Sequence, residues 1–202
     1  MGSKHQGDGT SAPEPQRRLS ATDWAQAALA AIGEGGLAGV AVEPLAVQLG
    51  TTKGSFYWHF QNRKALIEAA MQLWEHEHTE RIIALTDADP DPAVRLQNLF
   101  TFVVGYSRND RIEVALLATA DDPLVAPVMR RVTERRVGYV ASLFEELGLP
   151  ADEARHRALH AVSVYLGHVQ LAHAAPDTLA MQPEQWQRHM DGMMDALLPK
   201  PT

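Results

Sequence analysis

The side chains best suited to contact another molecule lie close together between Thr51 and Phe60. Polar or aromatic tips belong to Lys53, Ser55, Tyr57 and His59. Phe56 and Phe60, four residues apart, form an apolar face at helical spacing. A helix of this kind can pack on a core while it presents hydrogen-bonding groups outward. We find no nucleophile–base pair and no phosphate-binding loop in the chain, so the run favours a binding surface over a catalytic one.

Two short helices at a sharp turn are expected to position this run. Pro44 opens the first predicted helix, and Gly50 ends it, as glycine does after the last periodic residue. Thr51 or Thr52 can cap the second helix through its hydroxyl oxygen. A first helix, a tight turn with glycine and a short polar-aromatic second helix are the parts of a helix-turn-helix.

The same stretch resembles the signature of TetR-family transcriptional repressors. The residues that carry the resemblance are Gly50 to Phe60, Asn62, Arg63, Lys64 and Leu66. The family has a similar glycine-led turn, a similar aromatic run and a similar Asn-Lys-x-x-Leu helix start. The resemblance covers about residues 18–66, and the remainder matches the family only in length and helical pattern. One departure is Val42, where many members have Thr or Ser that caps the helix and touches phosphate; valine does neither.

The resemblance implies which side chains contact DNA. Residues that would face the major groove are Lys53, Gly54, Tyr57 and His59. A lysine can donate to O6 or N7 of guanine, and an aromatic ring can lie against the methyl group of thymine. Residues that would hold phosphates are Thr52, Ser55, Trp58 and Arg63. Phosphate contacts fix the register on DNA without reading its sequence. For Trp58, packing beside the two phenylalanines is the alternative.

Residues 1–18 are rich in Gly, Ser, Pro and Gln, and we expect a disordered arm. Arg17 and Arg18 close it, either as two solvated charges or as phosphate or minor-groove contacts.

Composition bounds the remaining possibilities. The chain has 202 residues, 46% of them hydrophobic and none of them cysteine. We expect no transmembrane helix and no signal peptide, which with the absent cysteines fits the cytoplasm. The net charge of −7 is unevenly spread. Residues 1–64 hold six basic and five acidic residues, whereas residues 65–202 hold twelve and twenty. The acidic charge therefore lies away from the predicted DNA-binding end.

An all-α fold of about nine helices is expected. Predicted domains are the arm (1–18), a helix-turn-helix head (19–66) and a ligand-binding and dimerisation domain (67–202). Helix starts are expected at Ser20, with Asp23 in a capping box, and at Asn62, Asp91–Pro92, Asn109–Asp110, Asp122–Pro123, Ala151 and Pro183. The helix from Asn62 towards Ile82 would leave the head and enter the second domain, where it could carry a signal.

The second domain is expected to hold a pocket. Apolar walls with a few polar tips are typical of small-molecule sites. Candidate lining residues are Trp74, His78, Phe102, Tyr106, Met129, Tyr139, Phe144 and Tyr165. Plain core packing is the alternative for each of them. We predict no metal site, because His76 and His78 point to different faces of a helix and the His156–His160 pair lacks a third ligand.

Two C-terminal helices with broad apolar faces predict a four-helix interface across a two-fold axis. Candidate interface residues are Leu159, Val162, Leu166, Val169, Trp186, Met190, Met193 and Met194. Burial against helices between 92 and 147 is the alternative. A dimer is favoured because one head reads few bases and DNA half-sites come in pairs.

These observations lead to one hypothesis with two rivals. The chain is predicted to be a homodimeric repressor, without cofactor, that leaves a pseudo-palindromic operator when a small-molecule effector binds. The first rival is an activator or a ligand-independent regulator with the same head. The second is a small helical enzyme, which the absence of a catalytic constellation disfavours.

Overall fold

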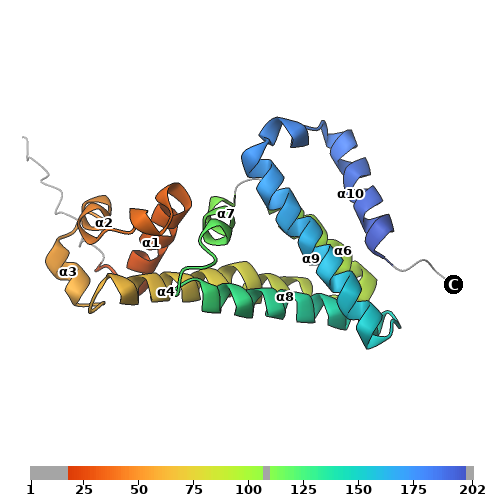
Figure 1. Cartoon of the computed structure of the whole chain (residues 1–202), viewed down its shortest axis with the longest axis horizontal. Helices are drawn as coiled ribbons and strands as arrows, with labels where there is room; N and C mark the ends of the chain where they lie inside the picture. The colour runs from red at the N-terminus through yellow and green to blue at the C-terminus, as the bar shows by residue number, and fades with distance from the viewer. Residues whose placement is uncertain (1–17, 107–109, 199–202) are drawn as a thin grey trace, which may run out of the picture.

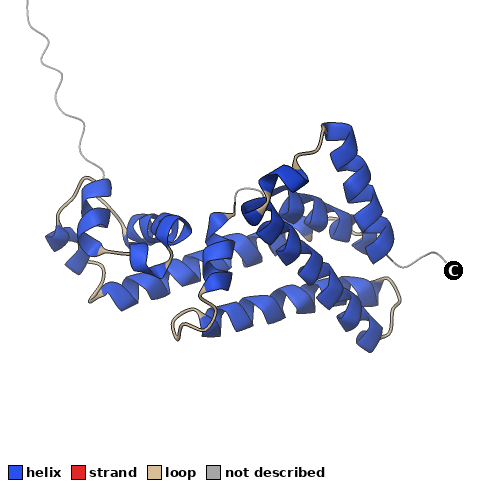
Figure 2. Cartoon of the chain, turned by 45° about the horizontal axis from the view of Figure 1, so that its top comes forward, coloured by secondary structure: helices blue, strands red, loops and turns tan. Residues whose placement is uncertain are grey.

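The fold is known from a computed structural model that describes residues 18–106 and 110–198. Within these residues every regular element is helical, and the predicted all-α class is confirmed (Figures 1 and 2). The α-helices are α1 (Ala21–Gly35), α2 (Val42–Gln48), α3 (Lys53–Tyr57), α4 (Arg63–Glu75), α5 (Arg81–Thr86), α6 (Pro92–Tyr106), α7 (Arg111–Ala118), α8 (Ala126–Glu146), α9 (Ala151–Ala174) and α10 (Pro183–Leu197). Short 3₁₀ turns are η1 (Leu37–Gly39) and η4 (Pro176–Leu179).

The helix that leaves the head is longer than α4 alone. A π-helical turn, η2 (His76–Glu80), joins α4 to α5 without a break. Counted as one helix, α4–η2–α5 brings the helices of the described residues to the predicted nine. Helix α8 runs beside this rod in the same direction (Figure 1), and Arg131 Nε of α8 donates to Glu75 Oε1 at 2.8 Å.

Most predicted helix starts are confirmed by their hydrogen bonds. The hydroxyl of Ser20 accepts from the Asp23 amide, and the Asp23 carboxylate accepts from Ser20, which completes the capping box. Thr52, not Thr51, caps α3, with Oγ1 3.3 Å from the Ser55 amide nitrogen. Asn62 Oδ1 accepts from the backbone of α4 at 3.0 Å. Short-range side-chain signals therefore define the head.

Two predicted starts need correction. Helix α2 begins at Val42 rather than Pro44, and its N-cap is Ala41, which offers no side-chain cap. Helix α8 begins at Ala126 rather than at Asp122–Pro123. The side chain of Asp122 instead accepts from the Leu124 amide at 2.8 Å and closes a turn before the helix. In the predicted Asn109–Asp110 start, Asp110 caps α7 and Asn109 lies outside the described residues.

Two apolar clusters form the core. The first packs α1, α2 and α3 against α4, and it continues into α7 and the start of α8 through Leu116 and Val128. The second joins α5, α6, α8, α9 and α10. The first cluster thus extends past residue 66, so the head shares its core with the helices that follow.

A histidine pair joins α9 to α10. His168 Nε2 lies 2.9 Å from His189 Nε2, and His168 Nδ1 lies 3.0 Å from the carbonyl oxygen of Val164. A carbonyl only accepts, so Nδ1 carries the proton and Nε2 of neutral His168 must accept from His189. Burial, and then the charge of His168, lower the pKa of His189 below its ordinary value of 6.5. If both rings were protonated, the two Nε2–H groups would face each other and the hydrogen bond between the rings would be lost.

The histidine pair predicts acid sensitivity of the α9–α10 contact. A lowered pKa means that the folded state binds fewer protons than the unfolded state, so this stability is complete above about pH 6.5 and falls as the pH drops through the folded pKa. The melting temperature should therefore decrease between pH 7.5 and 5.5 more in the wild type than in His189→Gln. An equal decrease in both proteins would contradict the assignment.

Candidate functional site

The head presents α3 with one face in the core and the other in solvent. Phe56 is fully buried, with its ring edge-to-face against Trp24 at 5.4 Å between centroids. Tyr57 is 57% exposed and Trp58 is 84% exposed. The packing alternative for Trp58 is therefore wrong, because the indole lies outside the core. Gly50, at φ 65°, makes the turn before α3 in a conformation that other residues avoid.

A surface hollow brings several predicted DNA contacts together. Its lining residues are Arg18, Leu19, Leu49, Gly50, Thr51, Ser55, Trp58 and His59. Arg18 thus lies beside α3 although it is far away along the chain, and Thr51 joins the set that the sequence analysis proposed. Arg17 lies outside the described residues. Hydroxyl, imidazole and guanidinium donors around one hollow suit a phosphate group.

Lys53 is paired with a residue that the sequence analysis did not single out. Its Nζ lies 2.5 Å from Glu43 Oε1, and both side chains are more than half exposed. The hydrogen bond that Lys53 donates to Glu43, helped by the charge of the carboxylate, raises the pKa of Lys53, and the same contact lowers the pKa of Glu43. Glu43 lies in the first turn of α2, so it holds Lys53 towards that helix. Lys53 must leave Glu43 before it can reach a base.

Arg63 has a structural partner in addition to its predicted phosphate contact. Its Nε donates to the Val40 carbonyl at 2.6 Å, and its Nη2 donates to the Leu37 carbonyl. These two carbonyls belong to the link between α1 and α2. Arg63 therefore fixes the entrance of α2 from the first residue of α4, and the phosphate contact stays a prediction.

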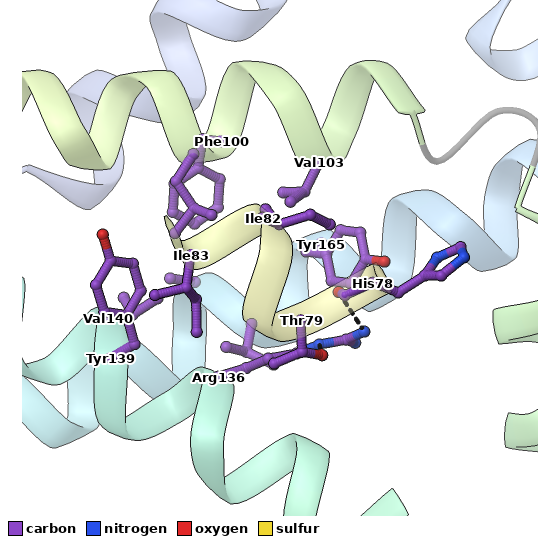
Figure 3. Close-up of a pocket in the computed structure, with 13 residues that line it drawn as sticks. His78, Thr79, Ile82, Ile83, Phe100, Val103, Arg136, Tyr139, Val140 and Tyr165 are labelled. Carbon is purple, nitrogen blue, oxygen red and sulfur yellow. Dashed lines mark hydrogen bonds between the residues drawn. The ribbon is translucent and has the colours of Figure 1, made fainter. Parts of the chain in front are cut away.

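A pocket lies where η2 and α5 meet α6, α8 and α9 (Figure 3). The space between its walls amounts to about 480 Å³, part of which is open to solvent. Its lining residues are His78, Thr79, Ile82, Ile83, Leu99, Phe100, Val103, Arg136, Tyr139, Val140, Ala161, Val162 and Tyr165. Most of the wall is aliphatic, and the polar groups gather at the end formed by η2.

Only three of the eight predicted pocket residues line this cavity, namely His78, Tyr139 and Tyr165. The residues buried elsewhere in the core are Trp74, Met129 and Phe144. Phe102 and Tyr106 are roughly half exposed, and their rings stack on each other at 6.2 Å. These five predictions are wrong for this cavity, because helical periodicity marks apolar residues but does not tell which of them border a void.

The polar end of the pocket is organised by Arg136 of α8. Its Nη1 and Nη2 donate to Glu113 Oε1 and Oε2 at 2.9 and 3.1 Å. Its Nε donates to Thr79 Oγ1 at 3.2 Å, and Nη2 also donates to the His78 carbonyl at 3.3 Å (Figure 3). Tyr165 Oη completes the group with a hydrogen bond to Glu113 at 3.4 Å. We call Arg136, Glu113, Thr79 and Tyr165 the Arg136 cluster.

Burial makes the charges of this cluster interdependent. Glu113 is fully buried, and only 12% of the Arg136 side chain is exposed. Burial opposes the charge of Arg136, but Glu113, Tyr165 and Asp110 together outweigh burial and raise the pKa of the guanidinium above its ordinary value. Burial, and then the charge of Glu113, raise the pKa of Tyr165 well above its ordinary value, so its hydroxyl stays protonated. Arg136, Glu113 and Thr79 were not predicted from the sequence. Arg136 lies 23 residues from Glu113 and 57 residues from Thr79 in the chain, so local spacing does not reveal their contacts.

The predicted interface residues fall into two groups. Val162, Val169, Met190 and Met194 are buried within the protomer, so their prediction as interface residues is corrected: they pack in its own core. The residues with accessible surface are Leu159, Leu166, Trp186 and Met193. Leu159 is 42% exposed, and Leu171 on the same helix is 44% exposed. Helix α9 therefore keeps exposed apolar side chains at Leu159 and Leu171 that a second molecule could cover.

In the part of the chain that the structure describes, no group of three or more His, Asp or Glu side chains is placed to hold a metal ion. Over residues 18–106 and 110–198, no helix has the length and hydropathy to cross a membrane.

The fold is all-α, and the head has the arrangement of a helix-turn-helix. Residues 26–70 match the family model of bacterial regulatory proteins of the tetR family, which confirms the resemblance seen in the sequence. The match covers the N-terminal segment and less than half of the chain. No curated protein matches the chain.

Solved structures of regulators share the whole fold. A transcriptional regulator from Rhodococcus sp. Rha1 is 20% identical over 89% of this chain and 96% of its own, with a TM-score of 0.71. A TetR transcriptional regulator from Legionella pneumophila is 13% identical over 90% and 98%, with a TM-score of 0.73. AibR, solved in complex with isovaleryl coenzyme A and operator DNA, is 18% identical over 89% and 98%, with a TM-score of 0.66. At these identities the likeness establishes the fold.

The Arg136–Glu113 pair predicts a large difference between buried and exposed ion pairs. Arg136→Ala leaves a buried carboxylate without its partner and should lower the free energy of unfolding by about 3–5 kcal/mol. The matched control is Arg155→Ala, which breaks an exposed pair with Glu134 and should leave the free energy of unfolding nearly unchanged. Urea denaturation measures both values. Similar losses in the two variants would show that Glu113 is not held as described.

Proposed function

We propose that this protein is a homodimeric transcriptional repressor that binds a pseudo-palindromic operator and is released from it by a small molecule. The observation that carries the proposal is the geometry of α3. Phe56 anchors the helix in the core, while Lys53, Tyr57 and Trp58 point into solvent. A short helix of this kind in a TetR-family domain is suited to enter the major groove.

The pocket supports the ligand-responsive part of the proposal. Its polar end is formed by η2, and η2 continues α4, whose first residues contact the head. A π-helical turn in a long helix often marks a functional site, because its hydrogen bonds differ from those of the flanking turns. A ligand that alters η2 would shift α4 and, with it, α3.

The proposed release depends on the spacing of two heads. In a dimer the two α3 helices must lie about 34–36 Å apart to enter successive major grooves. A change of a few ångströms would reduce the affinity. The ligand must bind the released conformation more tightly than the DNA-bound one, or the equilibrium does not move. AibR, which shares this fold, was solved in complex with isovaleryl coenzyme A and operator DNA, so a protein of this fold can take both kinds of partner.

The dimer is proposed to form through α9 and α10. The accessible apolar surface at Leu159 and Leu171 supports this arrangement, and closed two-fold dimers are the most common assemblies. We place the protein in the cytoplasm, where its DNA would be. An activator or a ligand-independent regulator with the same head is the second candidate, and reporter expression after gene deletion separates it from a repressor.

Selection of bound sequences from random duplex DNA, at two salt concentrations, tests the proposal. Recovery of a pseudo-palindrome with strong salt dependence is expected, because phosphate contacts release counterions. No enriched motif at either salt concentration would contradict it. Measurable enzymatic turnover that survives Lys53→Ala combined with Tyr57→Ala would favour the enzyme alternative.

Base reading and phosphate binding can be separated with two variants. Lys53→Ala should relax the preference at one operator position and cost about 1–3 kcal/mol in binding. Arg18→Ala should weaken all sequences equally and reduce the slope of log affinity against log salt by about one. Binding assays on the selected operator and on single-base variants measure both effects. Exchanged outcomes would show that the two roles are assigned wrongly.

A further inference from the structure

The charged groups beside the pocket are already paired with each other. The guanidinium of Arg136 donates to both oxygens of Glu113, to Thr79 and to the carbonyl of His78. Glu113 also accepts from Tyr165. Close to the same end, His78 Nδ1 lies 3.4 Å from Asp110 Oδ2, but that buried oxygen accepts no hydrogen bond, and Asp110 is not part of the pocket lining. The pocket therefore presents a neutralised ion pair rather than a free charge.

A charged ligand would have to break this pairing. A carboxylate that took Arg136 would leave Glu113, which is fully buried, without its cation. An ammonium that took Glu113 would leave Arg136 without its anion. A buried charge without a partner is strongly unfavourable, so either kind of ligand is penalised. An uncharged ligand leaves the Arg136 cluster intact.

The rest of the cavity wall favours the apolar groups of a ligand. Ile82, Ile83, Phe100, Val103 and Val140 form its wall on three helices (Figure 3). Apolar atoms placed against such a wall leave water, which is the main favourable term in binding of this kind. A polar group placed there would lose its hydrogen bonds to water without replacement.

One hydroxyl at the polar end can still serve a ligand. Tyr165 Oη donates its proton to Glu113, and its raised pKa keeps that proton in place. A phenolic oxygen that donates can also accept, so a ligand hydroxyl can donate to it.

We propose that the pocket takes an uncharged, mostly apolar molecule with a single hydroxyl or comparable hydrogen-bond donor. The inference rests on the proposed function, because it gives the chemical class of the effector of that same pocket. It excludes carboxylates and amines of similar size as effectors.

Three probes of equal chain length test the charge preference. They are 1-octanol, octanoate and octylammonium, titrated into the DNA-free protein by calorimetry at neutral pH. We expect 1-octanol to bind with a dissociation constant at least tenfold lower than the other two. Equal or tighter binding of octanoate or octylammonium, or no binding of 1-octanol, would overturn the inference.

Variants establish that the probe occupies this pocket. Val103→Phe places a larger side chain in the cavity and should raise the dissociation constant of 1-octanol at least tenfold. The matched control is Phe102→Leu, which changes the neighbouring, exposed residue and should leave binding unchanged. Binding that is insensitive to Val103→Phe would place the probe elsewhere and overturn the inference.

A charge variant provides the sharpest contrast. Glu113→Gln keeps the shape of the side chain but frees the charge of Arg136. Octanoate should then gain affinity relative to 1-octanol by at least tenfold, and no gain would contradict the argument from paired charges. If Glu113→Gln does not fold, the comparison of the three probes on the wild type still decides.

A separate measurement keeps this inference distinct from the proposed function. The titrations need no DNA, so they report on the pocket alone. Addition of 1-octanol to the protein on its selected operator then tests the regulator. Binding of 1-octanol without any loss of operator affinity would contradict ligand-induced release, whereas preference for a charged probe would contradict only the effector class.

Discussion

The ion pair between Arg136 and Glu113 is the constraint on which the rest of the structure depends. It joins α8 to α7, and the same guanidinium joins α8 to η2 through Thr79 and the His78 carbonyl. The ring of Trp74 lies 5.4 Å from the guanidinium carbon, so α4 is included as well. A buried pair of this kind tolerates few alternative geometries, because each charge is stable only beside the other. Four helical segments are thereby held in one arrangement around the pocket.

This arrangement also connects the pocket to the head by a route other than α4. Glu113 lies on α7, and the neighbouring Ile112 packs so closely on α1 that a Cβ at Gly33 would lie 3.2 Å from its side chain. Helix α1 carries Trp24, whose ring contacts Phe56 of α3. A movement of the intact Arg136 cluster would therefore be passed to α3 through α7 and α1 as well as through η2 and α4. Two rigid routes that start at one side chain couple a small change in the pocket to a larger one at the head.

The sequence predicted the head well and the pocket poorly for a physical reason. Capping residues such as Ser20, Thr52 and Asn62 act on amides three residues away, so local spacing is enough to find them. The Arg136 cluster forms between residues that are far apart in the chain and become neighbours only when α7 and α8 pack. The type of residue was no guide either, because arginine and glutamate are common on exposed helix faces, as in the Arg155–Glu134 pair.

The Lys53–Glu43 and Arg136–Glu113 ion pairs differ in how far their side chains are exposed to solvent. Lys53 and Glu43 are both more than half exposed, and an exposed pair of this kind is weak, so the proposed contact of Lys53 with a base would require little energy to separate the pair. In this structure Glu43 holds the lysine on the surface of the head. The buried Arg136–Glu113 pair cannot be exchanged in this way. Under the proposed function, the head would exchange partners on binding DNA while the pocket keeps its ion pair, so the shape of the ligand, rather than its charge, would be the signal that the helices transmit.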